Sequence, residues 1–198
     1  MIAFLQHMLH NLNNIQLKII TQLIKKRTYL RELAKAIGEI PSTTLRNIKL
    51  MTNQNLIDKH TEGKNTYYYL PRKLTSLSLI KIAENYNTLN FIKNNNNLLP
   101  IIKDILKLTK NENNVIIFGS YAKALQKKDS DLDILITSKN KNIKNKILEV
   151  NEIYDIEINP KITKNIEPNN LLIKEIIKNH IILKGGEFIY EQIYQNLD

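Results

Sequence analysis

Two aspartates placed two residues apart, directly before an apolar run, constrain the fold of this chain more than any other feature. They lie in the stretch NVIIFGSYAKALQKKDSDLDILITSK, residues 114–139. Aspartate is a poor strand former, and residues i and i+2 of a strand point to the same face. A strand over 131–137 therefore carries the carboxylates of Asp131 and Asp133 on one face and an apolar row on the other.

Two carboxylates on one face repel each other and are costly beside an apolar layer unless a cation lies between them. Oxygen ligands without a nearby His or Cys favour Mg²⁺ or Mn²⁺. Before the aspartates, a short apolar strand over 115–118 leads into Gly119-Ser120, where a helix start would present free amides and a hydroxyl to an anion. A phosphate-binding turn opposite a carboxylate pair suits metal-assisted nucleotidyl transfer. Calcium binding and two unrelated surface aspartates are the alternatives.

The segment GSYAKALQKKDSDLDILI matches the pattern G-S-x10-D-x-D and resembles the DNA polymerase beta superfamily, most closely its minimal nucleotidyltransferases. The resemblance implies transfer of a nucleoside monophosphate from an NTP, with ATP expected, to a hydroxyl acceptor, with Mg²⁺ or Mn²⁺ as cofactor. In that scheme Gly119, Ser120 and Lys123 bind the nucleotide. Asp131 and Asp133 are the first two catalytic and metal-binding carboxylates.

The family has a third carboxylate on a neighbouring strand, and IYDIEINPK, residues 153–161, is similar to that strand. The resemblance implies that Asp155 completes the metal site at the attacking hydroxyl and takes its proton, with Glu157 as the reserve candidate. Family members commonly have glycine four residues after the serine, where this chain has Ala124. Two further lysines follow Lys123 in this segment. Lys127 and Lys128, like Lys123, either neutralise phosphate or lie on a solvated helix face.

The positive charge of the chain is distributed unevenly. Residues 1–95 hold 14 Lys and Arg against 5 Asp and Glu, a net charge of +9, whereas residues 96–198 hold 15 against 14, a net charge of +1. A basic half joined to a nearly neutral half indicates a nucleic-acid-binding module attached to another domain. A generally basic solvated surface would instead predict an even spread. Because cysteine is absent, disulfides and thiolate metal sites are excluded.

The basic half shows a readable order of elements. We expect helices over 14–26 and over 28–37, the second ended by Gly38, and a third helix after Pro41. Two extended runs follow, over 56–60 and 66–70, around a Glu62-Gly63-Lys64 turn. In the third helix, Ser42 or Thr43 is expected to cap the start. The residues expected in its buried stripe are Leu45, Ile48, Leu50 and Met51.

This order resembles the winged helix-turn-helix of bacterial and archaeal transcriptional regulators over about residues 12–72. The resemblance implies that the third helix enters a major groove of duplex DNA, while the hairpin contacts phosphate. The candidate contacts on the helix are Ser42, Thr43, Thr44, Arg46, Asn47 and Lys49. Those on the hairpin are Lys59, His60 and Lys64. A protein-interaction or dimerisation unit is the alternative.

Together these features predict a two-domain α/β (α+β) protein: a winged helix over 1–73, a connecting helix and linker over 74–97, and a nucleotidyltransferase domain over 98–198. That domain should have a short mixed β-sheet flanked by helices. Two other functions stay open: a DNA-binding regulator whose second domain senses nucleotide or binds a partner, and an antitoxin that nucleotidylates a partner toxin. No apolar run reaches the roughly 18 residues of a membrane span, so we expect a cytoplasmic protein.

Overall fold

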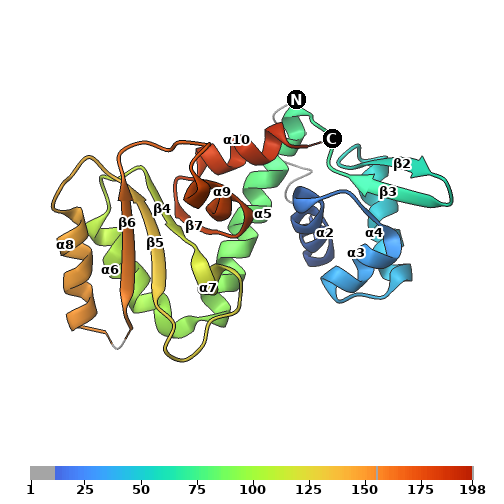
Figure 1. The fold of residues 1–198 in the computed structure, drawn as a ribbon. Coiled ribbons are helices and arrows are strands. Elements are labelled where there is room, and N and C mark those ends of the chain that lie inside the picture. The colour runs from blue at the N-terminus through green and yellow to red at the C-terminus, as the bar shows by residue number, and fades with distance from the viewer. Residues whose placement is uncertain (1–11, 155, 198) are drawn as a thin grey trace. The chain divides into compact units, whose positions relative to one another are not determined.

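The computed structural model of the protein describes residues 12–154 and 156–197, which form an α/β structure with two small sheets (Figure 1). The chain divides into two compact units, one comprising the chain up to Tyr86 and from Tyr190 on, the other Asn87–Ile189. The division falls within helix α5, Leu74–Asn94. In the described part of the chain, the helices do not reach the length and apolarity of a bilayer span.

The first unit contains helices α2–α4, the N-terminal part of α5, the C-terminal part of α10 (Glu187–Gln195) and a three-stranded antiparallel sheet of order β1-β3-β2. Its elements are α2 (Asn14–Lys25), β1 (Thr28–Tyr29), α3 (Leu30–Ile37), α4 (Pro41–Asn53), β2 (Asp58–Glu62) and β3 (Asn65–Tyr69). The predicted order of three helices and a hairpin is present, with the two-residue β1 as an addition. Gly38 ends α3 with φ +70°, as predicted for a left-handed helix stop.

Helix α4 differs from the sequence expectation in its cap and in its buried face. Ile40 is the N-cap residue and Pro41 occupies the first turn, so neither Ser42 nor Thr43 caps the helix. Leu50 was expected in the core, but it is 45% exposed. At about 100° per residue, Leu50 lies roughly 200° around the helix from the buried Ile48. The buried face consists of Thr44, Asn47, Ile48 and Met51.

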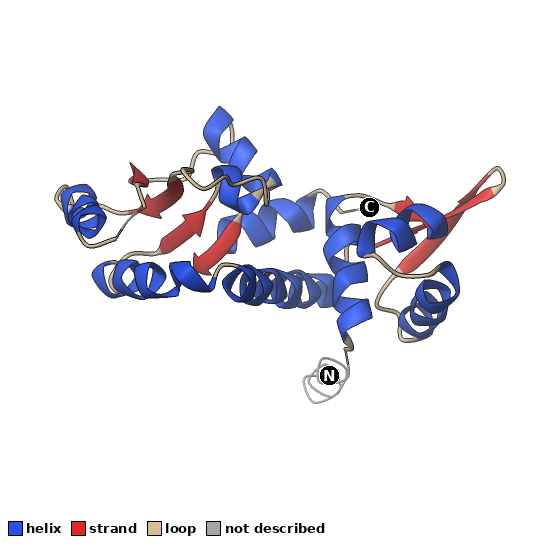
Figure 2. Ribbon diagram, turned by 90° about the horizontal axis from the view of Figure 1, so that it is seen from below, coloured by secondary structure: helices blue, strands red, loops and turns tan. Residues whose placement is uncertain are grey.

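The second unit is built on a four-stranded sheet of order β6-β5-β4-β7, with helices on both faces (Figure 2). β5 and β6 are parallel, and the β4 pairings with β5 and β7 are antiparallel, which confirms the mixed sheet. The strands are β4 (Asn114–Ile117), β5 (Leu132–Thr137), β6 (Ile158–Thr163) and β7 (Ile181–Lys184). Its helices are α6 (Leu99–Leu108), α7 (Gly119–Ala122), α8 (Ile143–Leu148) and α9 (Leu171–Lys178), with 3-10 turns η1 (Asn96–Leu98) and η2 (Glu149–Glu152), and α10 (Glu187–Gln195) begins in this unit and ends in the first.

The alternation of β5 fixes which face carries the aspartates. Leu132, Ile134 and Ile136 are fully buried in a core that also contains side chains of α6 and α8. A slip of one residue would bring Asp133 into this core, so the hydrophobic row determines the register of the whole strand. The predicted strand over 131–137 is therefore present one residue shorter, with Asp131 directly before it.

Strand β6 lies at the edge of the sheet and starts later than the sequence suggested. It begins at Ile158, whose N–H donates to Asn151 Oδ1 at 3.0 Å. Pro160, which has no N–H to offer, occupies the middle of this edge strand. Asp155 was expected on the strand, but it precedes β6 and lies outside the described residues.

Candidate functional site

The turn between β4 and α7 contacts the second aspartate directly. The N–H of Phe118 donates to the carbonyl oxygen of Asp133 at 3.0 Å, which joins the turn to β5. Gly119 has φ +71°, and a Cβ added there would overlap Oδ2 of Asp133 and lie 3.0 Å from its Cγ. Glycine is therefore required at 119 both by the backbone angle and by the space that the carboxylate occupies. The predicted juxtaposition of the Gly-Ser turn and an acid of β5 is present.

Asp133 is held by a neighbour that sequence reasoning did not identify. Asn159 faces Asp133 across the parallel β5–β6 pair, and its Nδ2 donates to Asp133 Oδ1 at 2.9 Å. Burial raises the pKa of Asp133, the Asn159 bond lowers that pKa, the charge of Asp131 raises it and the charge of Lys161 lowers it. The half-buried carboxylate thus has Asp131 and Lys161 as charged neighbours.

Asn159 lies in a row of residues on β6 that faces the same way as Asp133. Residues of a strand alternate between faces, so Glu157, Asn159 and Lys161 share this row. Glu157 directly precedes β6, and its carbonyl oxygen accepts from the N–H of Leu132 at 2.7 Å. In the sequence, the alternation of residues in EINPK is the signal from which this row, including Asn159, could have been predicted.

The acidic residues near this site do not form a complete metal cluster within the described residues, where no group of three His, Cys, Asp or Glu side chains is placed to hold an ion. Asp131 is exposed, and Asp133 is half-buried. Two neighbouring carboxylate oxygens without sulfur or imidazole fit a hard divalent cation. Glu157 is among the described residues and completes no such group with Asp131 and Asp133, whereas Asp155, the predicted third acid, lies outside them.

Of the basic residues predicted at the nucleotide, Lys123 has a defined partner. Its Nζ lies 2.6 Å from Glu175 Oε1 of α9, and this hydrogen bond and charge lower the pKa of Glu175. Ser120 is half-exposed, while Lys127 and Lys128 are exposed on the loop that follows α7. Lys161, which was not among the predicted residues, is the lysine that acts electrostatically on Asp133.

Ala124, which stands where the resemblance led us to expect glycine, has an unfavourable backbone conformation. Its φ is +54°. The N–H of Leu125 bonds the carbonyl of Ser120 at 3.0 Å, and the N–H of Ala124 bonds that of Tyr121 at 3.2 Å. These two bonds form the Schellman motif that ends α7, and the residue at this position is left-handed and usually glycine. The missing glycine therefore strains the end of α7 without displacing the Gly119 turn.

The predicted DNA contacts of α4 divide into exposed and buried residues. Ser42, Arg46 and Lys49 are exposed, at positions that share one face of the helix, and Thr43 is half-buried. Thr44 is fully buried and its hydroxyl donates to the Ile40 carbonyl at 3.1 Å. Asn47 is also buried.

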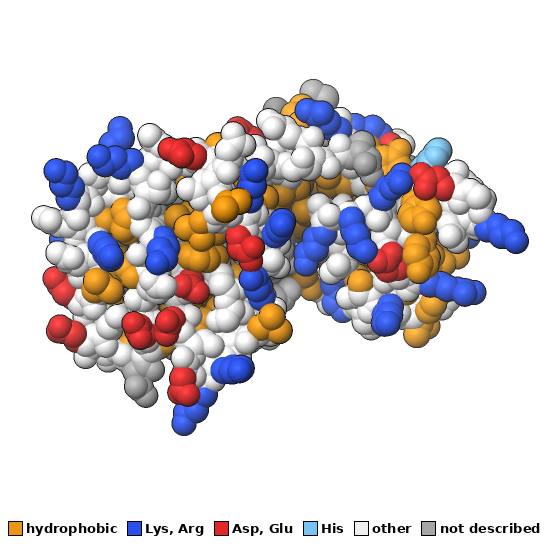
Figure 3. Space-filling model, viewed as in Figure 1, with side chains coloured by type: hydrophobic (Ala, Val, Ile, Leu, Met, Phe, Trp, Pro, Cys, Tyr) orange, Lys and Arg blue, Asp and Glu red, His pale blue; other side chains and the backbone are white. Residues whose placement is uncertain are grey.

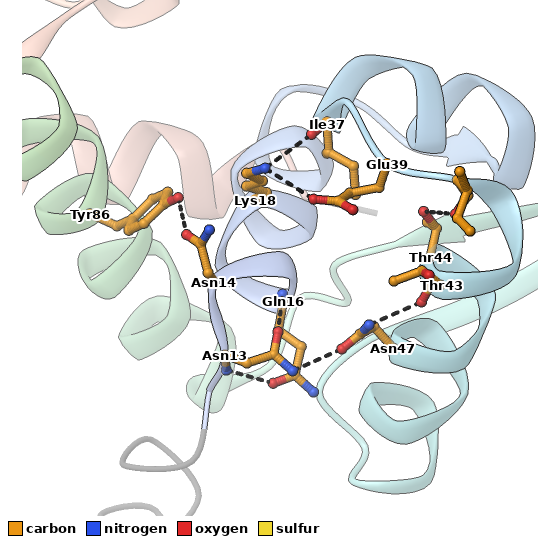
Figure 4. Close-up of polar contacts among 11 residues, drawn as sticks. Asn13, Asn14, Gln16, Lys18, Ile37, Glu39, Thr43, Thr44, Asn47 and Tyr86 are labelled. Atoms are coloured by element: carbon orange, nitrogen blue, oxygen red, sulfur yellow. Dashed lines mark hydrogen bonds and ion pairs between the residues drawn. The ribbon is translucent and has the colours of Figure 1, made fainter. Parts of the chain in front are cut away.

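Asn47 joins α4 to the start of α2. Its Nδ2 donates to the Thr43 carbonyl at 3.0 Å, and its Oδ1 accepts from Asn13 Nδ2 at 2.9 Å (Figure 4). Asn13 is also the capping residue of α2, bonded reciprocally with Gln16. Thr44 and Asn47 are thus packing residues, and their side chains are not available to DNA.

The hairpin carries the remaining predicted contacts. Lys59 and His60 on β2 and Lys64 at the turn are exposed. Beside them, Arg27 pairs with Glu62 at 2.8 Å and lies over the ring of Tyr67. Figure 3 shows lysine and arginine side chains over α2–α4 and the hairpin on the face in view, with acidic side chains between them. The surface offers dispersed positive charge that is partly paired.

Comparison with known proteins assigns a class to the second unit. Residues 101–193 match the family model described as "Polymerase beta, Nucleotidyltransferase". The matched segment includes the Gly119 turn, Asp131, Asp133 and the β6 row, so the similarity to this family covers the candidate site. No curated protein matches the chain.

A solved structure described as "Crystal structure of the toxin-antitoxin with AMP-PNP" is similar at 17% identity, covering 48% of this chain and 81% of that chain. Its TM-score is 0.38, and a likeness at that level carries no argument about this chain.

Proposed function

We propose that the protein is a metal-dependent nucleotidyltransferase that moves a nucleoside monophosphate from an NTP to a hydroxyl, with an attached DNA-binding module. The observation that carries the proposal is the packing of the Gly119 turn against the carboxylate of Asp133 within the segment that matches the nucleotidyltransferase family. This packing brings the turn, whose backbone amides we propose bind phosphate, next to the carboxylate of Asp133, an arrangement that suits metal-assisted nucleotidyl transfer.

In this proposal, Asp131 and Asp133 hold Mg²⁺ or Mn²⁺, which when bound neutralises the triphosphate and activates the attacking hydroxyl. Gly119 and Ser120 bind the outer phosphates through backbone amides and the serine hydroxyl. Asn159 holds Asp133 Oδ1, so that the other oxygen stays directed toward the turn. Lys123 can contact phosphate only if its ion pair with Glu175 opens.

We assign the third carboxylate to Asp155, with Glu157 as the reserve candidate. Asp131, Asp133 and Glu157 all lie within the described residues, where no group of three such side chains is placed to hold an ion, and this favours an acid other than Glu157. The role of this acid is to complete the metal site at the attacking hydroxyl and to accept its proton.

Metal-dependent binding of NTP tests the proposal directly. The full-length protein should bind an NTP in the presence of Mg²⁺ or Mn²⁺, and the double variant Asp131→Asn/Asp133→Asn should lose this binding. Glu112→Gln, an acid that lies before β4 and outside the site, is the matched control. Equal metal-nucleotide binding by the double variant and the control would contradict the proposal.

The attached module is proposed to bind duplex DNA through the exposed residues Ser42, Arg46 and Lys49 of α4 and through Lys59 and Lys64 of the hairpin. The exposure of these side chains and the net charge of +9 in residues 1–95 support this role. Duplex DNA is recognised by such modules through base contacts from a helix and phosphate contacts from flanking elements.

A further inference from the structure

A cavity of about 470 Å³ lies between strands β5 and β6, the segment after β6, and helices α8 and α9. Residues that line it include Leu135, Lys144, Lys161, Thr163, Glu167 and Leu172. The volume is within the roughly 300–1,000 Å³ typical of small-molecule sites. The lining combines apolar walls with hydroxyl, amide and charged groups, which suits a small polar ligand.

The cavity continues the row of residues that contains the candidate catalytic acids. Leu135 follows Asp133 by two residues on the same face of β5, and Lys161 follows Asn159 by two on β6. Two residues of a strand span about 7 Å, so a ligand in the cavity would lie next to Asp133. Lys161 connects the two places, since it lines the cavity and its charge also acts on Asp133.

The cavity also lies on the side from which an acceptor must approach. The Gly119 turn follows β4, and the sheet order places β4 and β6 on opposite sides of β5. In phosphoryl transfer the attacking and leaving oxygens are roughly in line on opposite sides of the phosphorus. If the outer phosphates bind at the β4 side, the attacking hydroxyl comes from the β6 side, where the cavity is.

The charge of the lining favours an anion. Within the described residues, neither Lys144 nor Lys161 forms an ion pair with another side chain. Glu167 is the acidic residue among those that line the cavity, so the two lysines give the lining a net positive charge. Hydrogen bonds from lysine to phosphate or carboxylate are among the stronger polar contacts in proteins.

We propose that this cavity is the acceptor site, and that it takes a small hydroxyl compound carrying a phosphate or carboxylate group held by Lys144 and Lys161. The inference rests on the proposed nucleotidyltransferase function. The acceptor hydroxyl oxygen forms a bond to the α-phosphorus, and the bond from that phosphorus to the α–β bridging oxygen breaks. Pyrophosphate leaves, and the hydroxyl proton passes to a carboxylate of the site and then to water.

The first test is equilibrium binding of three probes to the full-length protein: glycerol 3-phosphate, glycerate and glycerol. At least one of the two anionic probes should bind, and glycerol should not. The anionic probe that binds more tightly shows whether the site prefers a phosphate or a carboxylate group. Lys144→Ala/Lys161→Ala should weaken that probe at least about tenfold, and Leu172→Trp should block it by filling the cavity. Lys174→Ala, an exposed lysine of α9 outside the lining, should bind as wild type.

The second test separates this site from the nucleotide site. In cell extract with labelled NTP, Lys144→Ala/Lys161→Ala should lose at least about tenfold in transfer while its metal-dependent NTP binding stays within about twofold of wild type. Equal transfer by this variant and Lys174→Ala, label found on macromolecules alone, or anionic probes that do not bind would each overturn the acceptor site. If the wild-type protein itself does not bind NTP in the presence of metal, the proposed nucleotidyltransferase function fails, and not only the acceptor site.

Discussion

At the scale of single residues, Asp133 shows how the candidate active site opposes stability. Burial and the charge of Asp131 raise its pKa above the ordinary value of 3.8, and the bond from Asn159 offsets this only in part. Because the folded protein holds the proton more tightly than the unfolded chain, stability is lost as the pH rises through the raised pKa. Ionised Asp133 at neutral pH therefore destabilises the metal-free fold.

Asp133→Asn should consequently be as stable as wild type at neutral pH or more stable, by at most about 1 kcal/mol after solvent screening. The gain should shrink as the pH falls through the raised pKa of Asp133, because the wild-type carboxyl is then protonated as well. Thermal unfolding of both proteins without metal, across this pH range, measures the effect. A variant clearly less stable than wild type at neutral pH would show that the carboxylate itself stabilises the fold.

The third acid is tested by the pair Glu157→Gln and Asp155→Asn. If Asp155 completes the metal site at the attacking hydroxyl, Asp155→Asn should lose about 100-fold or more in transfer and retain NTP binding. Glu157→Gln should lose much less. The reverse order of effects would assign the role to Glu157.

At the scale of elements, the end of α7 carries the strain of Ala124 at φ +54°. A non-glycine residue in this region costs roughly 1 kcal/mol or more, so Ala124→Gly should stabilise the protein by about 1 kcal/mol. Ala122→Gly, two residues earlier inside α7, is the matched control and should destabilise by about 0.5–1 kcal/mol. Urea unfolding of the two variants gives both values, and a destabilised Ala124→Gly would rule out strain at the Schellman position.

Helix α4 and the hairpin should differ in their effects on DNA binding. Arg46→Ala should reduce discrimination between DNA sites, whereas Lys64→Ala should weaken all sequences alike and flatten the salt slope by about one unit. Binding isotherms of the full-length protein on several duplexes, at several salt concentrations, measure both. If neither variant changes DNA affinity and the protein self-associates through this surface, α4 belongs to an interaction unit.

The sequence predicted elements best where hydrophobic periodicity was strong. The apolar row of β5 and the Gly38 stop of α3 fall where expected, because burial fixes the first and a left-handed backbone fixes the second. Polar residues that serve the interior were missed. Thr44 and Asn47 look like surface residues by type, yet hydrogen bonds to backbone and to Asn13 let α4 bury them.

The sequence was sufficient to predict that the Gly119 turn lies near Asp133, but not which residues of β6 lie near Asp133. The close approach of Gly119 and Asp133 follows from a spacing within one segment of the chain. The contact between Asn159 and Asp133 depends on the register of two parallel strands separated by a helix. Such a register is set by packing across the sheet, so local sequence does not reveal that Asn159 meets Asp133 and leaves the choice of third carboxylate between Asp155 and Glu157 open.

At the scale of the whole molecule, the uneven charge should appear in the salt dependence of DNA binding. Each phosphate neutralised by the basic half releases about 0.9 of a counterion, so affinity should fall steeply as salt rises. Lys139→Ala, an exposed lysine of the nearly neutral half, should leave the slope unchanged. Measured affinities for one duplex at increasing salt give the slope. A flat dependence in the wild-type protein would exclude binding through the phosphate backbone.

The most direct test of the central claim is transfer itself. The full-length protein is incubated with each α-labelled NTP, Mg²⁺ and cell extract, and both labelled products and pyrophosphate are measured. The proposed function predicts label on an acceptor, one pyrophosphate released per label transferred, and background values for Asp131→Asn/Asp133→Asn. Transfer by this double variant at the wild-type rate, or a wild-type protein that transfers label from none of the NTPs, would contradict the assignment of a nucleotidyltransferase.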